Sequence, residues 1–314
     1  MIQEKMRFRA QHAAILLIPA LLFLGHVRQD DWPVLKGPYL GQKHPGMIPE
    51  IFAPHIIAEA PHSAAIFSPD GQSVFWVPWS TLKMKTMKQT NGLWTEPTVV
   101  PFALEFDAEN PWLTADGDRM YFTSTRHLES EGPNGRPKFW RENIWYVNRE
   151  GGGWSDPVPL GSEVNSRDLH WQFSIDDRNG DLYFSASSRE DGGGSDIYKS
   201  SLSAGRYTEP AILGEAINTQ GDEDTPFIAP DGSYLIFARK PGPNTFADFF
   251  ISFRSHDGSW QKAVCLSPPI NSEAHEVCPV VTRDGKYLFF ISMRTGKPQV
   301  YWMDAKGLWK EERR

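Results

Sequence analysis

The sequence predicts an all-β protein, a five-bladed β-propeller of four-stranded antiparallel blades, and three observations lead to this prediction. A hairpin pattern occurs five times, a Gly-x-aromatic turn follows each hairpin, and a strand-like segment near the N-terminus can complete the last sheet. The copies are spaced by about fifty residues, which is typical of propeller blades. Such repetition indicates one domain rather than several separate ones.

Each hairpin pattern consists of an apolar stretch, a turn with Asp and Gly, and an aromatic-rich stretch. Asp-Gly favours the tight turn that joins antiparallel strands, so each copy predicts the first two strands of a blade. The copies span residues 66–76, 111–122, 172–184, 226–237 and 279–290. The turn aspartates that we expect at equivalent positions are Asp70, Asp116, Asp177, Asp231 and Asp284.

The second half of each repeat predicts a third and a fourth strand. A β-rich stretch precedes a Gly, one spacer and an aromatic residue, which is Trp94, Trp154, Tyr207, Trp260 or Trp309. Proline in several of the fourth stretches suits an edge strand, where a missing N–H costs no ladder hydrogen bond. We expect the regular aromatic residues to pack between blades. Trp112 and Trp171 begin inner strands instead, and they are the better candidates for ligand contact.

The fifth repeat ends at Arg314, with no room for a fourth strand. Residues 49–57 resemble the fourth strands and precede the first inner strand. We therefore expect this N-terminal strand to complete the last blade, so that both chain ends share one sheet and no edge is left open. Six blades are the alternative if residues 32–60 hold a degenerate blade, although that stretch contains no Asp-Gly hairpin.

The N-terminal residues predict export. Three basic residues within the first nine positions precede an apolar run at 13–25, which is shorter than the roughly twenty residues of a membrane-spanning helix. The cleavage pattern is poor, so an uncleaved anchor is an alternative. We expect residues 1–30 to be a signal peptide or anchor, 31–48 a lead-in linker and 49–314 the propeller, located in the periplasm or outside the cell.

The charge and the cysteines narrow the range of partners. The 314-residue chain has 32 Lys and Arg against 39 Asp and Glu, a formal net charge of −7, and no basic run, which argues against nucleic acid. Cys265 and Cys278 fall on strands about three spacings of roughly 4.8 Å apart, beyond disulfide reach. We expect two buried free thiols and a monomeric protein.

Polar residues are expected to gather at one mouth of the central channel. In an antiparallel blade the start of the first strand and the end of the second lie on the same rim, close to the axis. Carboxylates or histidines precede the first strands, and an Arg follows most second strands. The candidate ligand-binding residues are Glu109, Arg126, Asp168, His170, Arg189, Asp222, Glu223, Asp224, Arg239, Glu276 and Arg294. His62 and His275 precede first strands in the same way.

This ring of charges has two interpretations. The Arg of one blade can pair with a carboxylate of the next and hold the ring closed, since Arg and carboxylate form bidentate pairs. Alternatively, the Arg side chains bind a small anionic ligand such as a carboxylate or phosphate. The longest loop on this rim spans residues 125–141, and loops on a rigid scaffold commonly carry binding sites.

Catalytic and metal-binding motifs are not found. The sequence has no G-x-S-x-G elbow, no H-E-x-x-H or paired-Cys pattern, and no EF-hand spacing around residues 222–224. We expect no catalytic residue, no metal and no cofactor. Carboxylate pairs at the channel mouth leave a glycan-active hydrolase, sialidase-like or another glycosidase, as the alternative, and residues 255–260 partly match the Asp-box of sialidases.

The S/A-P-D-G hairpins at residues 68–71 and 229–232 resemble the WD40-like β-propeller repeats of the TolB type. The resemblance covers about residues 49–314 and includes the Ser-Arg and Gly-rich stretch at 188–198 and the segment 154–161. It implies a location in the cell envelope and mainly protein or ligand binding. TolB has six blades and an extra N-terminal domain, neither of which we expect here, so its particular partners are not implied.

The leading hypothesis is therefore an exported, non-catalytic propeller that binds a protein partner or a small anionic ligand of the cell envelope on this rim. Arg side chains that converge without partners would favour the anion, and carboxylates all clamped by Arg would favour scaffolding. An open pocket with two carboxylates roughly 5–9 Å apart and no Arg partner would favour hydrolysis.

Overall fold

The computed structural model describes residues 32–128, 142–165, 169–187, 194–242 and 244–310, and Val34–Arg314 forms one compact unit. The expected signal peptide or anchor lies outside the described residues. Within the described part of the chain, no helix is both long and apolar enough to cross a membrane.

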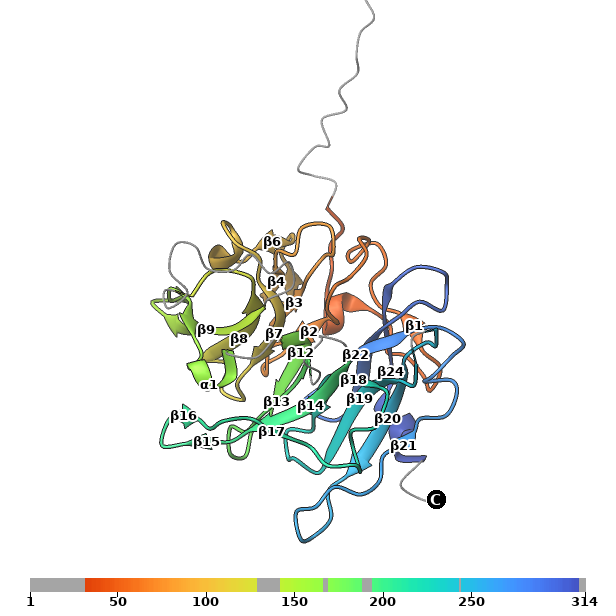
Figure 1. The fold of residues 1–314 in the computed structure, drawn as a ribbon. Coiled ribbons are helices and arrows are strands. Elements are labelled where there is room, and N and C mark those ends of the chain that lie inside the picture. Colours follow the sequence, from red (N-terminus) through yellow and green to blue (C-terminus); the bar gives the residue numbers. More distant parts are fainter. Residues whose placement is uncertain (1–31, 129–141, 166–168, 188–193, 243, 311–314) are drawn as a thin grey trace, which may run out of the picture. The chain divides into compact units, whose positions relative to one another are not determined.

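The compact unit is the predicted five-bladed propeller, and its first strands β2, β7, β12, β18 and β22 gather around the centre of the unit (Figure 1). Blade 1 contains β2 (Ile66–Phe67), β3 (Ser73–Trp76), β4 (Lys85–Thr90), β5 (Leu93–Trp94) and β6 (Thr98–Val99). Blade 2 contains β7 (Glu109–Leu113), β8 (Arg119–Ser124), β9 (Asn143–Glu150), β10 (Gly153–Trp154) and β11 (Val158–Pro159). Blade 3 contains β12 (Leu169–Ile175), β13 (Leu182–Ser187), β14 (Ser195–Ser200) and β17 (Ala211–Ile212).

Blade 4 contains β18 (Asp222–Ile228), β19 (Tyr234–Lys240), β20 (Asp248–Phe253) and β21 (Val264–Cys265). Blade 5 contains β22 (Glu276–Val281), β23 (Tyr287–Ser292), β24 (Gln299–Asp304) and β1 (Glu50–Ile51). A small hairpin of β15 (Leu202–Ser203) and β16 (Arg206–Tyr207) follows β14. The short helices are α1 (Ser162–Asn165) and the 3₁₀ turns η2 (Tyr39–Gly41), η3 (Pro101–Ala103) and η5 (Ala305–Lys310).

The predicted closure of the ring is confirmed. Strand β1 pairs antiparallel with β24, with Glu50 opposite Trp302 and Ile51 opposite Tyr301, and Figure 1 shows the two strands side by side. The Phe52 N–H continues the ladder by donating to the Val300 carbonyl at 2.8 Å. The N-terminal and C-terminal strands of the unit therefore share one sheet, and the six-bladed alternative falls away.

The Asp-Gly turns form as predicted in four of the five hairpins. In each of the four, a side-chain oxygen of the turn Asp accepts a hydrogen bond from the backbone N–H two residues later, at Gln72, Asp118, Ser233 and Lys286. The third hairpin has a loop of the same length, since Ile175 pairs with Leu182 as Phe67 pairs with Val74, but its glycine comes one position later. There Asn179 accepts from the Asp181 N–H at 3.0 Å. Asp177, expected at the equivalent position, instead pairs with Arg283.

Most first strands contain a bulge where they line the channel. The strand pairing shifts register between Glu109 and Trp112 and at the corresponding points of β12, β18 and β22. Asn110, Thr225 and Cys278 have positive φ angles at three of these bulges, and a proline follows each of them. Bulges re-aim side chains and commonly occur next to functional sites, so these positions fix what faces the channel.

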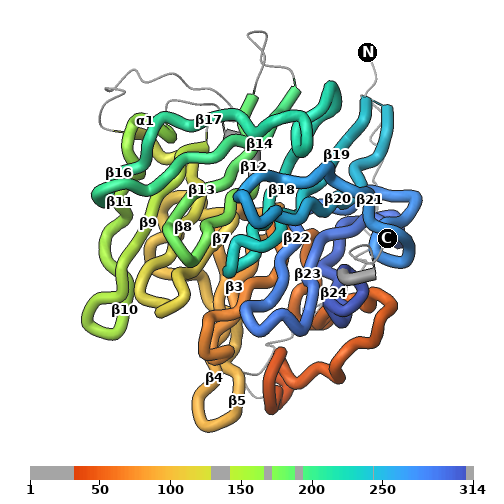
Figure 2. Tube along the Cα trace, turned by 90° about the horizontal axis from the view of Figure 1, so that it is seen from below, coloured from red at the N-terminus to blue at the C-terminus, as the bar shows by residue number. Residues whose placement is uncertain are grey.

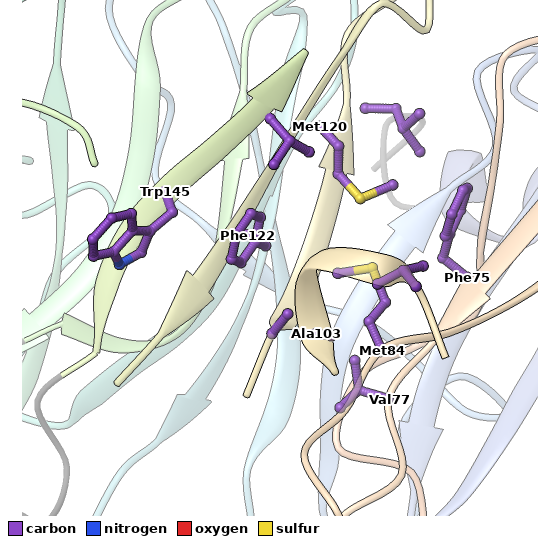
Figure 3. Packing of buried hydrophobic residues seen from close by; sticks show 11 residues of the cluster. Phe75, Val77, Met84, Ala103, Met120, Phe122 and Trp145 are labelled. Atoms are coloured by element: carbon purple, nitrogen blue, oxygen red, sulfur yellow. The ribbon is translucent and has the colours of Figure 1, made fainter. Parts of the chain in front are cut away.

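The core lies between neighbouring blades. Figure 3 shows the cluster between blades 1 and 2, in which Phe75 and Met84 of blade 1 face Met120 and Phe122 of blade 2. Trp154 packs against this cluster, and Trp260 packs against a second cluster that includes Tyr183 and Phe237. The prediction that the Gly-x-aromatic residues pack in the structure holds for these two.

The lead-in residues 34–49 run across the seam between the first and last blades, as Figure 2 shows. On blade 1, the Gly37 carbonyl accepts from Trp94 Nε1 at 2.7 Å. On blade 5, the Gly46 carbonyl accepts from the Asp304 N–H at 2.8 Å, and the Tyr39 ring packs against Trp302 at 5.6 Å. The segment expected as a linker is thus a packed strap.

Three asparagines fasten the connections between blades to the third strands. The Asn218 side chain accepts from the Ile197 N–H at 2.9 Å and donates to the carbonyls of Ile197 and Leu213. The same arrangement occurs at Asn165 and Asn271. A side chain thereby replaces the missing strand partner of two backbone groups.

Both cysteines are free thiols, as predicted. Cys278 is buried at a bulge of β22, and burial raises the pKa of its thiol to about 12. Cys265 lies exposed on the outer strand β21, so the expectation that it is buried was wrong. An outer strand has one face in solvent, and Cys265 occupies that face.

Candidate functional site

The rim Arg and Glu residues of blades 4 and 5 pair within their own blade. Arg239 Nε lies 2.7 Å from Glu223 Oε1, and Arg294 lies 3.2 Å from Glu276 Oε1. Both carboxylates are fully buried. The interpretation that Arg pairs with a carboxylate of the next blade is therefore wrong for these two pairs. In blade 4 the reason is geometric, since Glu223 and Arg239 stand directly opposite each other on neighbouring strands.

These pairs hold the loops that lead into their blades. Glu223 accepts from the Thr219 N–H at 3.0 Å and from the Thr219 hydroxyl at 2.6 Å, and Arg239 donates to the Ile217 carbonyl at 2.7 Å. Blade 5 repeats the arrangement with Glu276, Arg294, Ser272 and Ile270. Each buried charge is paired and hydrogen-bonded, as a structural ion pair requires.

Among the residues that the structure describes, Arg126 of blade 2 has no acidic partner of this kind. Its guanidinium donates to the Phe102 carbonyl at 2.9 Å and to Ser124 Oγ at 3.1 Å, and it lies over the rings of Phe106 and Trp145 at 5.0 and 5.3 Å. The three described rim arginines therefore have contacts inside the chain and do not converge on one cavity. Arg189 and Asp168 lie outside the described residues, and His170 is described only as a backbone position of β12, opposite Ser185.

A different set of side chains meets at blades 1 and 2, close to the channel bulges. His62 Nδ1 and Glu109 Oε2 are 2.8 Å apart, and both side chains are buried. Burial raises the pKa of Glu109 to about 9 and lowers that of His62. Near neutral pH these shifts keep the Glu109 carboxyl protonated and the His62 imidazole uncharged.

A second buried acid, Glu142, stands beside this pair. Burial, with the nearby Glu109 as a further cause, raises the pKa of Glu142 to about 8. Its carboxyl hydrogen-bonds Thr123, and the Thr123 hydroxyl also accepts from Asn110 Nδ2 at 3.1 Å. We call His62, Glu109, Asn110, Thr123 and Glu142 the throat cluster. Among the described residues, no group of three or more His, Cys, Asp or Glu has the spacing of a metal site.

On the rim, two adjoining cavities form a groove between blades 4 and 5, with volumes of about 360 and 560 Å³. They share His275 and Met293, and we call them together the seam groove. Phe246 and Met293 expose 57% and 42% of their surface there, although both are large apolar side chains. The Phe246 ring stands edge-on to His275 at 5.1 Å, and His275 Nδ1 accepts from the Ala247 N–H at 3.1 Å.

The charged side chains of the seam groove are mainly acidic. Asp222 and Asp224 line one cavity with Lys240, and the exposed Glu273 lines the other with the already paired Arg294. Burial lowers the pKa of His275, which keeps the imidazole neutral near pH 7. The predicted neighbours Asp222 and Asp224 do share a site, whereas Glu223 points to the other face of β18, because side chains alternate along a strand.

Trp112, a candidate for ligand contact, lies at the opposite mouth of the channel. It lines a cavity of about 250 Å³ that also includes Tyr39, Phe227 and Arg283. The Arg283 guanidinium lies 5.9 Å from the Trp112 ring. The other candidate, Trp171, lies in β12, and its side chain is outside the described part of the structure.

Comparisons with known proteins bear on the fold. No protein-family model matches the sequence, and no curated protein matches it. Among solved structures, a TolB-like protein from Agrobacterium tumefaciens is similar over 78% of this chain and 77% of its own, with 16% identity and a TM-score of 0.50.

Two further structures are similar at lower scores. The tricorn protease matches 79% of this chain and 22% of its own at 14% identity, with a TM-score of 0.46. Hydrazine synthase from Kuenenia stuttgartiensis matches 77% of this chain and 76% of its own at 14% identity, with a TM-score of 0.44. At these identities the likeness shows a β-propeller fold and nothing finer.

Proposed function

We propose that this chain is an exported, non-catalytic β-propeller that binds a protein partner along the seam groove of its channel-mouth rim. The observation that carries the proposal is the exposure of Phe246 and Met293 beside a groove with several carboxylates. Large apolar side chains at the centre of a polar rim are the usual anchors of protein interfaces. Export belongs to the proposal because of the basic and apolar N-terminal residues.

The charges favour a partner with a basic segment over a small anion. Arg126, Arg239 and Arg294 are engaged inside the chain, so their capacity to bind an added anion is reduced. The groove is lined by three acidic side chains, Asp222, Asp224 and Glu273, against Lys240 and the already paired Arg294, so its acidic groups outnumber its basic ones. An extended segment with an apolar side chain and a Lys or Arg complements this surface.

The size of the expected effect follows from the two anchors. Fully burying a Phe or Met side chain contributes about 1.5–3 kcal/mol. Loss of even part of this from two anchors corresponds to more than a tenfold loss of affinity, since a factor of ten is about 1.4 kcal/mol. The double variant Phe246→Ala, Met293→Ala should therefore lose the partner while the blades keep their fold.

The test is capture of partners by the purified full chain from separate envelope and cytosolic extracts, with quantitative mass spectrometry. We expect one envelope protein to be recovered with the wild type and at least tenfold less with the double variant. The matched control is Ile212→Ala on β17, which removes an apolar side chain of similar exposure, 53%, on another blade. Direct binding of the recovered protein, purified, must show the same ranking.

Equal recovery with wild type and double variant would contradict the seam groove as the binding site, and recovery only from the cytosolic extract would contradict export. The same preparations are assayed against a panel of fluorogenic glycosides. Turnover that Asp224→Asn abolishes would replace binding with glycan hydrolysis by the Asp222 and Asp224 pair. This outcome decides between the two classes because a docking surface hydrolyses nothing.

A further inference from the structure

Two buried polar atoms of the throat cluster are left unpaired by the rest of the described chain. Asn110 Oδ1 and Glu142 Oε2 are buried and have no hydrogen-bond partner among the described residues. Their side chains are 97% and 93% buried. Both residues hydrogen-bond Thr123, which holds the amide and the carboxyl against each other. Unpaired buried polar atoms are costly, so a ligand group that pairs with both of them would stabilise the cluster.

We propose that the throat cluster is a binding site for a primary ammonium group, as carried by a small organic amine. An ammonium offers three N–H donors, and the cluster offers Asn110 Oδ1, Glu142 Oε2 and the Glu109 carboxyl as acceptors. No residue of the throat cluster lines the seam groove, so this site is distinct from the proposed protein interface.

The acids in the cluster make binding an exchange of cations. When the ammonium enters, the Glu142 carboxyl loses its proton to solvent, and the carboxylate then pairs with the ammonium. The net charge of the site is unchanged, so the burial that disfavours a lone carboxylate no longer opposes ionisation. The titratable and charged groups that act on Glu142 or on its neighbours are His62, Asp107, Glu109, Asp224 and Cys278.

The site lies within reach of the rim. The buried thiol of Cys278 is influenced by both Asp224 and Glu142, and its Sγ lies 3.9 Å from the His62 carbonyl oxygen. Asp224 is only partly buried and lines the seam groove. Asp224 thus places an acidic side chain at the rim near the throat cluster, where it attracts a cation from solvent.

The probe is methylammonium chloride, titrated into the full chain at pH 7 by calorimetry in two buffers of different ionisation enthalpy, neither a primary amine. We expect saturable binding with release of close to one proton per site. Glu142→Gln should bind at least tenfold more weakly and release no proton. The control Glu96→Gln, at an exposed acid of blade 1, should behave as the wild type.

A second variant separates ammonium recognition from proton release. It also keeps the proposal testable if Glu142→Gln does not fold. Asn110 has a φ of 49°, which glycine adopts without strain, so Asn110→Gly removes the acceptor and keeps the bulge. It should weaken methylammonium binding about tenfold while proton release at saturation persists. Equal binding of tetramethylammonium, which has no N–H, or of potassium would overturn the proposal, as would the lack of saturable heat.

Discussion

Glu109 is a carboxyl that the fold keeps protonated at neutral pH. It is buried against His62 at 2.8 Å, and desolvation is the largest cause of its raised pKa. An imidazolium beside it would have lowered that pKa, but burial lowers the pKa of His62 as well. The two residues therefore form an uncharged pair rather than an ion pair.

The stability of the protein should consequently fall as pH rises. The pKa of Glu109 is about 9 in the folded state and near 4.5 when the side chain is exposed, so between these values the unfolded chain binds fewer protons. The slope for one such group is at most about 1.4 kcal/mol per pH unit. Glu109→Gln, which keeps an uncharged side chain of the same length, should flatten the profile measured by urea unfolding at pH 5 to 9.

The exposed-site variant Glu96→Gln should keep the wild-type slope, because that side chain is in solvent. Parallel pH profiles for wild type and Glu109→Gln would show that Glu109 is ionised in the folded protein. Glu142 adds to the wild-type slope in the same direction, since its pKa is raised to about 8.

For single residues, the sequence predicted where the charged side chains lie along the strands, but it did not predict which groups they contact. Glu109, Asp222 and Asp224 were predicted at the channel mouth, and the structure shows them at first-strand starts. The burial of Glu109 against His62 depends on how two blades meet, which no local pattern encodes. Likewise, nothing in the sequence distinguishes Phe246 and Met293 from buried apolar residues. Their exposure is seen only in the folded structure.

Among the elements, the asparagine clamps were not predicted, although they repeat in three blades. Each clamp follows a fourth strand and bonds to the third strand of the same blade, so its role appears only once the sheet has formed. In the sequence the clamps share a simple signal, a Leu five residues before the Asn: Leu160 with Asn165, Leu213 with Asn218 and Leu266 with Asn271. The Leu carbonyl accepts from the Asn amide in every case.

Removal of one clamp should destabilise the protein markedly. Asn218→Ala leaves the Ile197 N–H without its 2.9 Å acceptor in a buried setting, and it also removes two donated bonds. We expect a loss of about 2–4 kcal/mol in the free energy of unfolding, measured by urea titration.

The control is Asn244→Ala, at an exposed position of the loop after β19, where the cost should be within about 0.5 kcal/mol. Similar costs for both variants would mean that the clamp adds nothing beyond an exposed amide.

The hairpins themselves were predictable because the Asp-Gly pair favours a tight turn by itself. The third hairpin was misaligned because Gly180 comes one position later in a loop of the same length, and Asn179 takes the hydrogen bond expected of Asp177.

For the whole molecule, the sequence predicted both the propeller fold and the number of blades, because each repeat carries the same local signals. The fourth strand missing from the last repeat could be assigned to the N-terminal segment that forms β1. Phe52 follows β1 and packs at 5.0 Å from both Phe289 and Trp302 of blade 5. It also contacts Phe67 of blade 1 at 6.0 Å, so it joins the two blades that close the ring.

Phe52→Ala should therefore weaken the closure. The side chain is 1% exposed, and truncation of a buried Phe costs about 3–5 kcal/mol. We expect this loss in urea unfolding, together with faster hydrogen exchange of β1 and β24 amides. Ile48→Ala, at a 70% exposed apolar residue four positions earlier, should change stability by less than about 0.5 kcal/mol. Unchanged exchange at β24 in Phe52→Ala would contradict a role in closure.

The pairing of β1 with β24 also sets an order of events during biosynthesis. Strand β1 leaves the ribosome first among the strands, yet its partner is the last to be made. The final sheet can form only after β24 has emerged, because contacts between distant segments require both to be present. Until then, β1 and the strap cannot pair with β24. A nascent chain that ends before residue 299 therefore cannot close the propeller ring.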